Sequence, residues 1–317
     1  MKAGRAGLSS AINSTVIDEI RDNIKGQLLH LEPMKNHTTY KTGGAAKLLA
    51  CPRDSKEAEW LYRFAHRHEI GTTVIGAGSN IIAPRRGIEG LVIKTRSSGA
   101  RLEFKSGERL IAEAGVYLDS LIRRAAERGF GGLAALAGIP GTVGGAVFMN
   151  AGTRKGDISR VVNWVEALTA DGEKLRLNAG EIEFGYRESI FRHRPWLILR
   201  GEFRLQRADM EKTLHEIDRI WEKRMRSYPM QLPTAGSVFK NPEGRHAGEL
   251  IDRAGCGGMR VGGAMVSEMH ANFIVNLGGA NSDDIIELVR RVRKKVFQKF
   301  GVFLQLEQKI IRQQQSS

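Results

Sequence analysis

Residues 129–153 read GFGGLAALAGIPGTVGGAVFMNAGT and carry no charged side chain. A stretch of this length is long enough to cross a bilayer. However, it holds eight glycines and Pro140, and these residues destabilise a helix strongly. We therefore expect short buried pieces joined by tight turns. Because an uncharged glycine-rich loop lets the backbone approach a flat or phosphorylated ligand closely, residues 138–146 are a candidate binding cradle.

A second glycine motif, Gly76-Ala77-Gly78-Ser79-Asn80, follows a buried strand expected at residues 72–75. Successive glycine amides can form an anion-binding nest. The third glycine of a dinucleotide fingerprint and the Gly-Lys-Ser/Thr of a phosphate loop are both missing, so neither of those sites is expected. Alone, such a motif is more often a turn than a phosphate site. Together with residues 138–146, it predicts two backbone cradles, one for a pyrophosphate and one for a planar ring.

The chain length of 317 residues predicts about two domains and a sizeable core. Its two cysteines, Cys51 and Cys256, form no C-x-x-C motif. This excludes a disulfide scaffold and a cysteine-based zinc site, and it favours a reducing, cytoplasmic compartment. The first ten residues, MKAGRAGLSS, are polar and lack the apolar region of a secretory signal peptide.

The charge balance is strongly basic, with 49 lysines and arginines against 35 aspartates and glutamates and a net charge of +14. Such a field attracts nucleic acid, an acidic membrane or a phosphorylated substrate. Basic residues are scattered except at 290–299, where an apolar stripe of helical spacing indicates a solvated helix face. No nucleic-acid-binding module and no basic stripe interleaved with aromatic residues is recognisable. A nucleic-acid-binding protein is the non-enzymatic alternative.

Hydrophobic periodicity predicts helices and strands that interleave without a regular βαβ period, which favours an α+β fold over a doubly wound sheet. Helices are expected at residues 14–29, from the capping box Asp54-x-x-Glu57, from about 118 to a stop at Gly129, and at 209–225 and 283–300. Strands are expected at residues 46–51, 72–75, 90–94, 109–116, 161–169, 174–177, 197–205, 271–276 and 302–311. The best domain boundary lies near residues 205–209, where a strand gives way to a long polar helix.

Three side chains are candidates for chemistry. Arg187 offers a fixed fork of donors for a carboxylate or phosphate, although an arginine among charged neighbours is usually a surface residue. Ser237 is a weak acid, useful only towards a strongly basic carbon or oxygen, and is otherwise a structural turn residue. Glu307 lies in an apolar stretch where periodicity alone indicates a solvated face. His246 and His270 lack the context of a metal site, so no metal is expected.

These motifs occur in an order that resembles the bacterial UDP-N-acetylenolpyruvoylglucosamine reductases, flavoenzymes of peptidoglycan precursor synthesis. The resemblance covers almost the whole chain, from about residue 36 to residue 311. It rests on the segments NHTT at 36–39 with Gly43-Gly44, GAGSN at 76–80, AGIPGTVGGAVFMNAG at 137–152, GYRES at 185–189, AGSVFKNP at 235–242 and VSEMHANFIVN at 266–276.

The resemblance implies an α+β fold in which a two-subdomain FAD-binding unit of the vanillyl-alcohol-oxidase-like type precedes a substrate-binding α+β domain. Residues 1–33 would be a tail and helix, residues 34–206 the FAD-binding domain and residues 207–317 the substrate-binding domain. The two FAD subdomains would divide near residues 95–105. The implied reaction is the NADPH-dependent reduction of UDP-N-acetylglucosamine enolpyruvate to UDP-N-acetylmuramate, with noncovalent FAD, in a cytoplasmic monomer without a membrane span.

The resemblance also implies roles for individual residues. Arg187 and Glu307 would polarise the substrate carboxylate as an enolate forms, and Ser237 would donate a proton to the adjacent carbon. Substrate contacts would fall on Lys240, Asn241 and His270. The FAD-binding residues would be Gly76, Ala77, Gly78, Ser79, Asn80, Gly141, Thr142, Gly144, Gly145 and Ala146.

The chain departs from the family pattern at a few points. The family usually has Arg where Lys41 stands and Glu where Gln305 stands. The 50-residue interval from Arg187 to Ser237 resembles the shorter type, which lacks an extra tyrosine loop over the substrate. The enzymatic alternative is another oxidoreductase of the same superfamily, many of which tether FAD covalently through His or Cys. Cys51 and the histidines lie outside the cradle motifs, which argues against such a tether.

Overall fold

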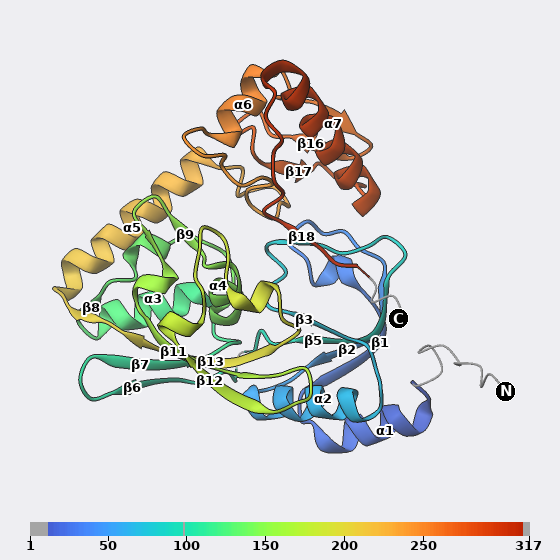
Figure 1. Cartoon of the computed structure of the whole chain (residues 1–317), viewed down its shortest axis with the longest axis vertical. Coiled ribbons are helices and arrows are strands. Elements are labelled where there is room, and N and C mark those ends of the chain that lie inside the picture. Colours follow the sequence, from blue (N-terminus) through green and yellow to red (C-terminus); the bar gives the residue numbers. More distant parts are fainter. Residues whose placement is uncertain (1–11, 98, 313–317) are drawn as a thin grey trace.

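The computed structural model describes residues 12–97 and 99–312, and it is built from three packed units (Figure 1). The tail expected before the first helix falls almost entirely outside the described residues. Helix α1 covers Ser14–Asn23 and is capped by the side chain of Asn13. The expectation that this helix continues to residue 29 is wrong, because strand β1 (Gln27–Pro33) pairs antiparallel with strand β2 (Ala45–Cys51).

Helix α1 ends where the carboxylate of Glu57, from helix α2 (Ser55–Arg67), binds the chain. This group accepts hydrogen bonds from the backbone amides of Lys25 and Gly26 at 3.0 and 3.1 Å, which directs the chain away from the helix axis. A Cβ on Gly26 would lie 2.1 Å from the carbonyl oxygen of Cys51, so the chain crosses β2 closely at this point. The capping box expected with Asp54 does not close, because Glu57 accepts from the amide of Arg53 at 2.8 Å, one residue before Asp54; the side chain of Asp54 caps helix α2.

The first unit is a four-stranded sheet in the order β1-β2-β5-β3, in which β5 is Ile88–Lys94 and β3 is Thr72–Ile75. Strands β2 and β3 both run parallel to β5. Helix α2 packs on this sheet through Leu61 and Phe64, which are fully buried. Because the carboxyl end of β3 leads directly into residues 76–80, the sheet fixes where the first glycine loop begins.

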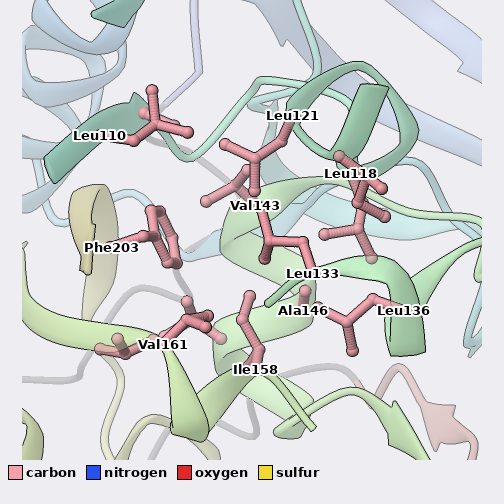
Figure 2. Packing of buried hydrophobic residues seen from close by; sticks show 14 of the residues in the cluster. Leu110, Leu118, Leu121, Leu133, Leu136, Val143, Ala146, Ile158, Val161 and Phe203 are labelled. Atoms are coloured by element: carbon pink, nitrogen blue, oxygen red, sulfur yellow. The ribbon is translucent and has the colours of Figure 1, made fainter. Parts of the chain in front are cut away.

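The second unit is a five-stranded antiparallel sheet in the order β12-β11-β13-β7-β6. The strands predicted at residues 161–169 and 174–177 are confirmed as β11 and β12, and they form an antiparallel hairpin. Figure 2 shows the core of this unit, where Leu110 and Phe203 of the sheet meet Leu121 and Val143 of two helices. The strands are β6 (Leu102–Lys105), β7 (Arg109–Glu113), β11 (Val162–Leu168), β12 (Lys174–Asn178) and β13 (Leu197–Arg204), and the helices that contribute to its core are α3 (Leu118–Glu127), α4 (Val143–Met149) and α5 (Met210–Ser227).

Residues 129–153 fold within this unit as the short buried pieces that their glycine content predicts. They form strand β8 (Phe130–Gly131), the 3-10 turn η3 (Ala134–Leu136) and helix α4. Gly144 is required inside α4, since a Cβ there would lie 2.7 Å from the Cβ of Ala114. Nowhere in residues 12–97 and 99–312 does a helix combine the length and the hydropathy needed to cross a membrane.

The third unit is a small antiparallel sheet of β15 (Arg260–Val261), β16 (Ala264–Val266) and β17 (Ile274–Asn276), packed against helices α6 (Ala247–Arg253) and α7 (Ser282–Phe300). Gly301, with φ +66°, ends α7 as predicted. The strand expected over residues 302–311 is wrong for most of its length. Only β18 (Lys309–Ile310) forms a regular ladder, and it pairs with β4 (Ile81–Ile82) of the first unit rather than within the third.

Helix α5 connects the second and third units. Its buried residue Ile217 and the half-buried Leu214 and Ile220 pack into the core of the second unit. The remaining short elements are η2 (Met34–Asn36), β9 (Gly152–Thr153), β10 (Gly156–Asp157), η4 (Ile158–Arg160), η5 (Ala179–Glu181), η6 (Ile190–Arg192) and β14 (Gln206–Arg207).

Candidate functional site

A cleft of about 1550 Å³ lies where the three units meet. Both glycine loops line it, residues 76–80 from the first unit and residues 139–142 and 144–146 from the second. The third unit contributes residues 234–237 and 268–273, and Glu307 completes the wall. The structure therefore brings both predicted cradles and all three candidate catalytic residues to one cavity.

Residues 37–39 pack against the backbone of the first glycine loop at Gly78. Gly78 has φ +72°, and a Cβ there would lie 2.0 Å from the carbonyl oxygen of His37. The amide of Thr39 donates a hydrogen bond to the carbonyl of Gly78 at 3.1 Å. Gly78 is thus required by the protein chain itself, whatever ligand lies above the loop.

The two glycine loops touch each other and form one continuous surface. The hydroxyl of Ser79 donates a hydrogen bond to the carbonyl of Pro140 at 2.7 Å, and a Cβ on Gly76 would lie 2.5 Å from Oγ1 of Thr142. By contrast, a Cβ on Gly141 or Gly145 would meet no atom closer than 3.5 Å, although both residues line the cleft. These two bare backbone positions fit a flat ring lying against the loop.

A charged chain that sequence reasoning missed supports the first loop. Nζ of Lys94 lies 2.8 Å from Nδ1 of His37, and Nε2 of His37 lies 2.9 Å from Glu32. Because the ammonium can only donate, Nδ1 accepts and the imidazole is neutral. Burial lowers the pKa of His37, opposed by its hydrogen bond to Glu32, and burial also lowers the pKa of Lys94. His37 belongs to the NHTT segment, but nothing in the sequence indicates that Lys94 is its partner.

Arg187 sits at the tip of a tight turn in which Gly185 and Glu188 exchange backbone hydrogen bonds. Its backbone is left-handed, with φ +57°, which is unusual for a residue with a side chain. The guanidinium reaches Glu307, with Nε 3.2 Å from Oε1, and also donates to the carbonyls of Asn150 and Gly152. These contacts hold the side chain in the cleft wall, so the surface-residue alternative for Arg187 is wrong.

Glu307 lies on a strand-like segment that runs beside residues 237–240. Its amide donates to the carbonyl of Val238 at 2.9 Å. Its side chain is only 15% exposed, so the solvated face indicated by periodicity alone is wrong. Burial raises the pKa of Glu307, and the charge and hydrogen bond of Arg187 oppose this rise. The carboxyl group therefore holds a proton more readily than an exposed glutamate does.

Ser237 follows Gly236, whose φ of +75° turns the chain at this point. The backbone of Ser237 bridges to Phe273, which places the residue at the edge of the third unit. The side chain lines the cleft, and within the described residues its hydroxyl makes no hydrogen bond. The hydroxyl is thus available to a ligand in the cleft.

The three candidate substrate contacts lie in different surroundings. Asn241 lines the cleft, and its amide donates to the hydroxyl of Tyr186 at 3.4 Å. His270 also lines the cleft and packs against the ring of Tyr228, with centroids 5.1 Å apart, while burial lowers its pKa. Lys240 is not among the described residues that line the cleft, because its ammonium is bound to Glu188.

Cations dominate the rest of the cleft wall. Among the described lining residues, nine lysines and arginines face four aspartates and glutamates. Arg224 donates to the carbonyl of Gly138 at 3.0 Å and lies over the ring of Tyr228, and burial lowers its pKa. No three His, Cys, Asp or Glu side chains gather closely enough to hold a metal ion in the part of the chain that the structure describes. The site is therefore suited to anionic ligands.

Comparisons with known proteins agree with this geometry. The sequence model of the FAD binding domain matches residues 46–178, which span both glycine loops. An alkyldihydroxyacetonephosphate synthase of known structure shares the fold at 16% identity and a TM-score of 0.50, over 62% of this chain and 41% of that one. Fold and site together define a flavoprotein with a two-part FAD-binding region and a smaller additional domain, in agreement with the predicted α+β architecture.

The relatives narrow this class. The chain is 42% identical to a UDP-N-acetylenolpyruvoylglucosamine reductase from Carboxydothermus hydrogenoformans over 93% of this chain and 97% of the relative, and 42% identical to one from Moorella thermoacetica over 91% and 95%. The crystal structure of the reductase from Thermus caldophilus matches with a TM-score of 0.77 at 34% identity, over 91% of this chain and all of that one. The model of the reductase C-terminal domain covers residues 228–311. The chain belongs to the UDP-N-acetylenolpyruvoylglucosamine reductase family.

Proposed function

We propose that this chain catalyses the NADPH-dependent reduction of UDP-N-acetylglucosamine enolpyruvate to UDP-N-acetylmuramate, a step of peptidoglycan precursor synthesis. The observation that carries the proposal is the convergence of both glycine loops, the Arg187–Glu307 pair and the free hydroxyl of Ser237 on one cleft. The chemistry that bound FAD supplies is hydride transfer from NADPH to the enol ether. Family membership favours this enzyme over a superfamily oxidase and over a nucleic-acid-binding protein.

The glycine loops are the proposed FAD site. Residues 76–80 would hold the pyrophosphate through their backbone amides, as an anion-binding nest does. Gly141, Thr142 and residues 144–146 would lie against the flavin, where the missing side chains of Gly141 and Gly145 leave room for a ring. Because Ser79 bonds to Pro140, the two halves of this site keep a fixed separation.

The proposed role of Arg187 and Glu307 is electrostatic. Negative charge develops on the carboxylate end of the substrate as an enolate forms, and preorganised donors stabilise such charge best. Arg187 is anchored by two backbone carbonyls and one carboxyl group, so it needs little reorganisation. Glu307 lines the cleft beside this guanidinium, and whenever its carboxyl group holds a proton it can donate a second hydrogen bond to the same group.

Ser237 is the proposed proton donor to the carbon next to the carboxylate. A hydroxyl is a weak acid, but the enolate carbon is very basic, so the transfer is favourable once the two atoms are in contact. The absence of another partner for the hydroxyl within the described residues supports this role. Asn241 and His270 are the proposed contacts to the remainder of the UDP-sugar, since both line the same cleft.

Further proposals concern the protein as a whole. We propose a cytoplasmic location, supported by the two free cysteines, which are typical of a reducing compartment. We also propose that the protein acts as a monomer, because the described residues of one chain bring together every candidate catalytic group. The proposed division is a segment to residue 33, an FAD-binding domain to 206 and a substrate-binding domain from 207, with α5 as the connection.

The activity is tested with purified protein loaded with FAD. Under anaerobic conditions, NADPH in excess over the enzyme should be consumed only when the enolpyruvyl UDP-sugar is added, and the product should gain two hydrogens by mass spectrometry. Consumption of NADPH that needs oxygen and not the sugar would identify an oxidase instead. Protein that binds no flavin would contradict the proposal at its first step.

A further inference from the structure

Two consecutive residues of the turn at 185–188, one cationic and one anionic, each form an ion pair with a residue that follows helix α5. Arg187 binds Glu307, and Glu188 binds the ammonium of Lys240. Both pairs connect the second unit to residues that follow α5 in the chain. The side chain of Lys240 is 13% exposed, and that of Arg187 is 17% exposed, so solvent screens neither pair strongly.

Lys240 and Glu307 belong to one ribbon of two short chain segments. The amide of Lys240 donates to the carbonyl of Gln305 at 2.8 Å, and the amide of Glu307 donates to that of Val238 at 2.9 Å. Ser237 lies on the first segment of this ribbon, three residues before Lys240. The ribbon therefore carries both Ser237 and Glu307, and the turn carries Arg187.

Glu188 is built to remain ionised. Burial opposes its charge, but Lys240, Arg192 and His193 outweigh burial and hold the pKa of Glu188 below its usual value. Nε of Arg192 lies 3.1 Å and Nε2 of His193 lies 3.3 Å from its second oxygen. Arg192 and His193 therefore lie close to Oε2, which accepts no hydrogen bond from the described residues, while Oε1 binds Lys240.

We infer that Glu188 and Lys240 are a positioning pair that sets the ribbon bearing Ser237 and Glu307 against the turn bearing Arg187. This inference rests on the proposed function and replaces the substrate contact that the resemblance implies for Lys240. Removing Glu188 would leave the largely buried ammonium of Lys240 without its partner, and removing Lys240 would release the ribbon from Glu188. The ribbon would then shift relative to the turn, and a displacement of about 1 Å can cost about 10²-fold in rate.

The test compares Lys240→Met, Lys240→Arg and Glu188→Gln in the FAD-loaded enzyme. Reduction of the flavin by NADPH should stay within about twofold of the wild type, because the pair positions Ser237, Glu307 and Arg187, which are proposed to act on the UDP-sugar and not on NADPH. Reoxidation by the enolpyruvyl UDP-sugar should slow by about 10- to 100-fold in Lys240→Met. The dissociation constant of that sugar, from flavin absorbance, should change less than about threefold. Lys240→Arg should recover most of the lost rate, since it keeps the charge.

Coupling is measured in the double variant Glu188→Gln/Lys240→Met, which should be no slower than Lys240→Met alone if the two residues act as a pair. Lys105→Met is the matched control, because Lys105 pairs with Glu103 on the exposed strand β6, outside the cleft. If Lys240→Met does not fold, Glu188→Gln replaces it, with the same expected changes in flavin reduction, reoxidation and sugar affinity. A weakened sugar affinity at an unchanged reoxidation rate, or no effect at all, would overturn the inference. A wild-type enzyme that fails to reduce the sugar would contradict the proposed function instead.

Discussion

The guanidinium of Arg187 and the carboxyl group of Glu307 are 120 residues apart in sequence and 3.2 Å apart in the cleft. Each is surrounded by backbone contacts that determine where its charge lies. Arg187 is placed by a left-handed turn, and Glu307 by a ribbon that pairs with residues 237–240. The pair therefore depends on the packing of two units, and each member has a distinct effect that can be measured.

Ser237→Ala tests the proton transfer. If the hydroxyl acts only on the carbon of the substrate, flavin reduction by NADPH should remain nearly unchanged. Reoxidation by the enolpyruvyl UDP-sugar should slow by about 10²- to 10⁴-fold, the usual loss for a missing general acid. Anaerobic stopped-flow absorbance separates the two halves. Ser227→Ala, also in the cleft wall, is the control. Equal slowing of both halves, or of neither, would mean that Ser237 is a structural turn residue.

Glu307→Gln tests the raised pKa of this carboxyl group. Because the native pKa lies above the unfolded value, the native state binds more protons, and ionisation above that value disfavours folding. The Tm of the variant should therefore fall less than that of the wild type as pH rises above the unfolded pKa of about 4.3, because the variant has no carboxyl group to ionise at this position. Its reoxidation by the sugar should be slower. The exposed Glu243→Gln should change neither quantity. If the Tm of Glu307→Gln falls with rising pH as steeply as that of the wild type, the pKa of this carboxyl group is not raised in the native state.

At the scale of single elements, the glycines of the two loops differ in whether the protein itself leaves room for a side chain. Gly78 and Gly144 are surrounded by protein atoms, so a bulky residue at either position would damage the loop before any ligand is considered. Gly141 and Gly145 face the cleft with room for a Cβ. Substitutions at Gly141 and Gly145 can therefore change flavin binding without disturbing the fold, whereas substitutions at Gly78 and Gly144 cannot.

Gly145→Ala is the sharper substitution, because it lies inside helix α4. Alanine should stabilise the flavin-free protein by about 0.5–1 kcal/mol relative to glycine in a helix. The same Cβ should lower flavin occupancy, since it enters the space proposed for the ring. Thermal melting of the flavin-free protein and the flavin-to-protein absorbance ratio measure the two effects. Gly180→Ala, where nothing lies within 4 Å, should leave occupancy unchanged. Full occupancy in Gly145→Ala would count against the flavin contact.

The segment at residues 36–39 predicts a pH dependence. The native pKa of His37 is lowered, so the unfolded state binds more protons and stability falls as pH drops below the unfolded value of about 6.5. A proton on Nδ1 would also face the ammonium of Lys94, with Lys41 nearby and only Glu32 opposed to it. Flavin should dissociate more readily at lower pH, since His37 supports Gly78.

Titration of flavin fluorescence between about pH 5 and 8 measures this dependence. His37→Gln removes the titrating group, so the flavin affinity of this variant should change less with pH than the flavin affinity of the wild type. His270, whose pKa is also lowered by burial, contributes a residual slope of the same sign to stability. If flavin affinity depends on pH in the same way in His37→Gln and in the wild type, protonation of His37 does not control flavin binding.

Elements stabilised by neighbouring residues were predictable from the sequence, and elements stabilised by distant ones were not. The hairpin of β11 and β12 and the helix α7 are determined by turn residues and caps within the segment. Strands β1 and β18 depend on partners that periodicity does not identify, namely β2 and β4. The same limit applies to side chains. The motifs identify Lys240, but only packing shows that its partner is Glu188.

At the scale of the whole molecule, part of the excess of positive charge lies in the cleft wall. Nine lysines and arginines line the cleft among the described residues, against four carboxylates. The proposed substrates, NADPH and a UDP-sugar with a carboxylate, are both anions. The net charge of +14 thus has a functional explanation besides solubility, through electrostatic attraction of substrates to the cleft.

This explanation predicts a salt dependence of substrate capture. The attraction is screened over about 8 Å at physiological ionic strength, so kcat/KM for both substrates should fall several-fold as salt rises from about 0.05 to about 0.5 M. The value of kcat should move little, because buried contacts such as Arg187 to Glu307 are screened much less. Lys223→Gln, in the cleft wall, should flatten the profile, whereas Lys56→Gln, exposed on α2 outside the cleft, should not. If kcat/KM is independent of salt, the cations of the cleft do not steer substrates, and the positive charge serves the surface instead.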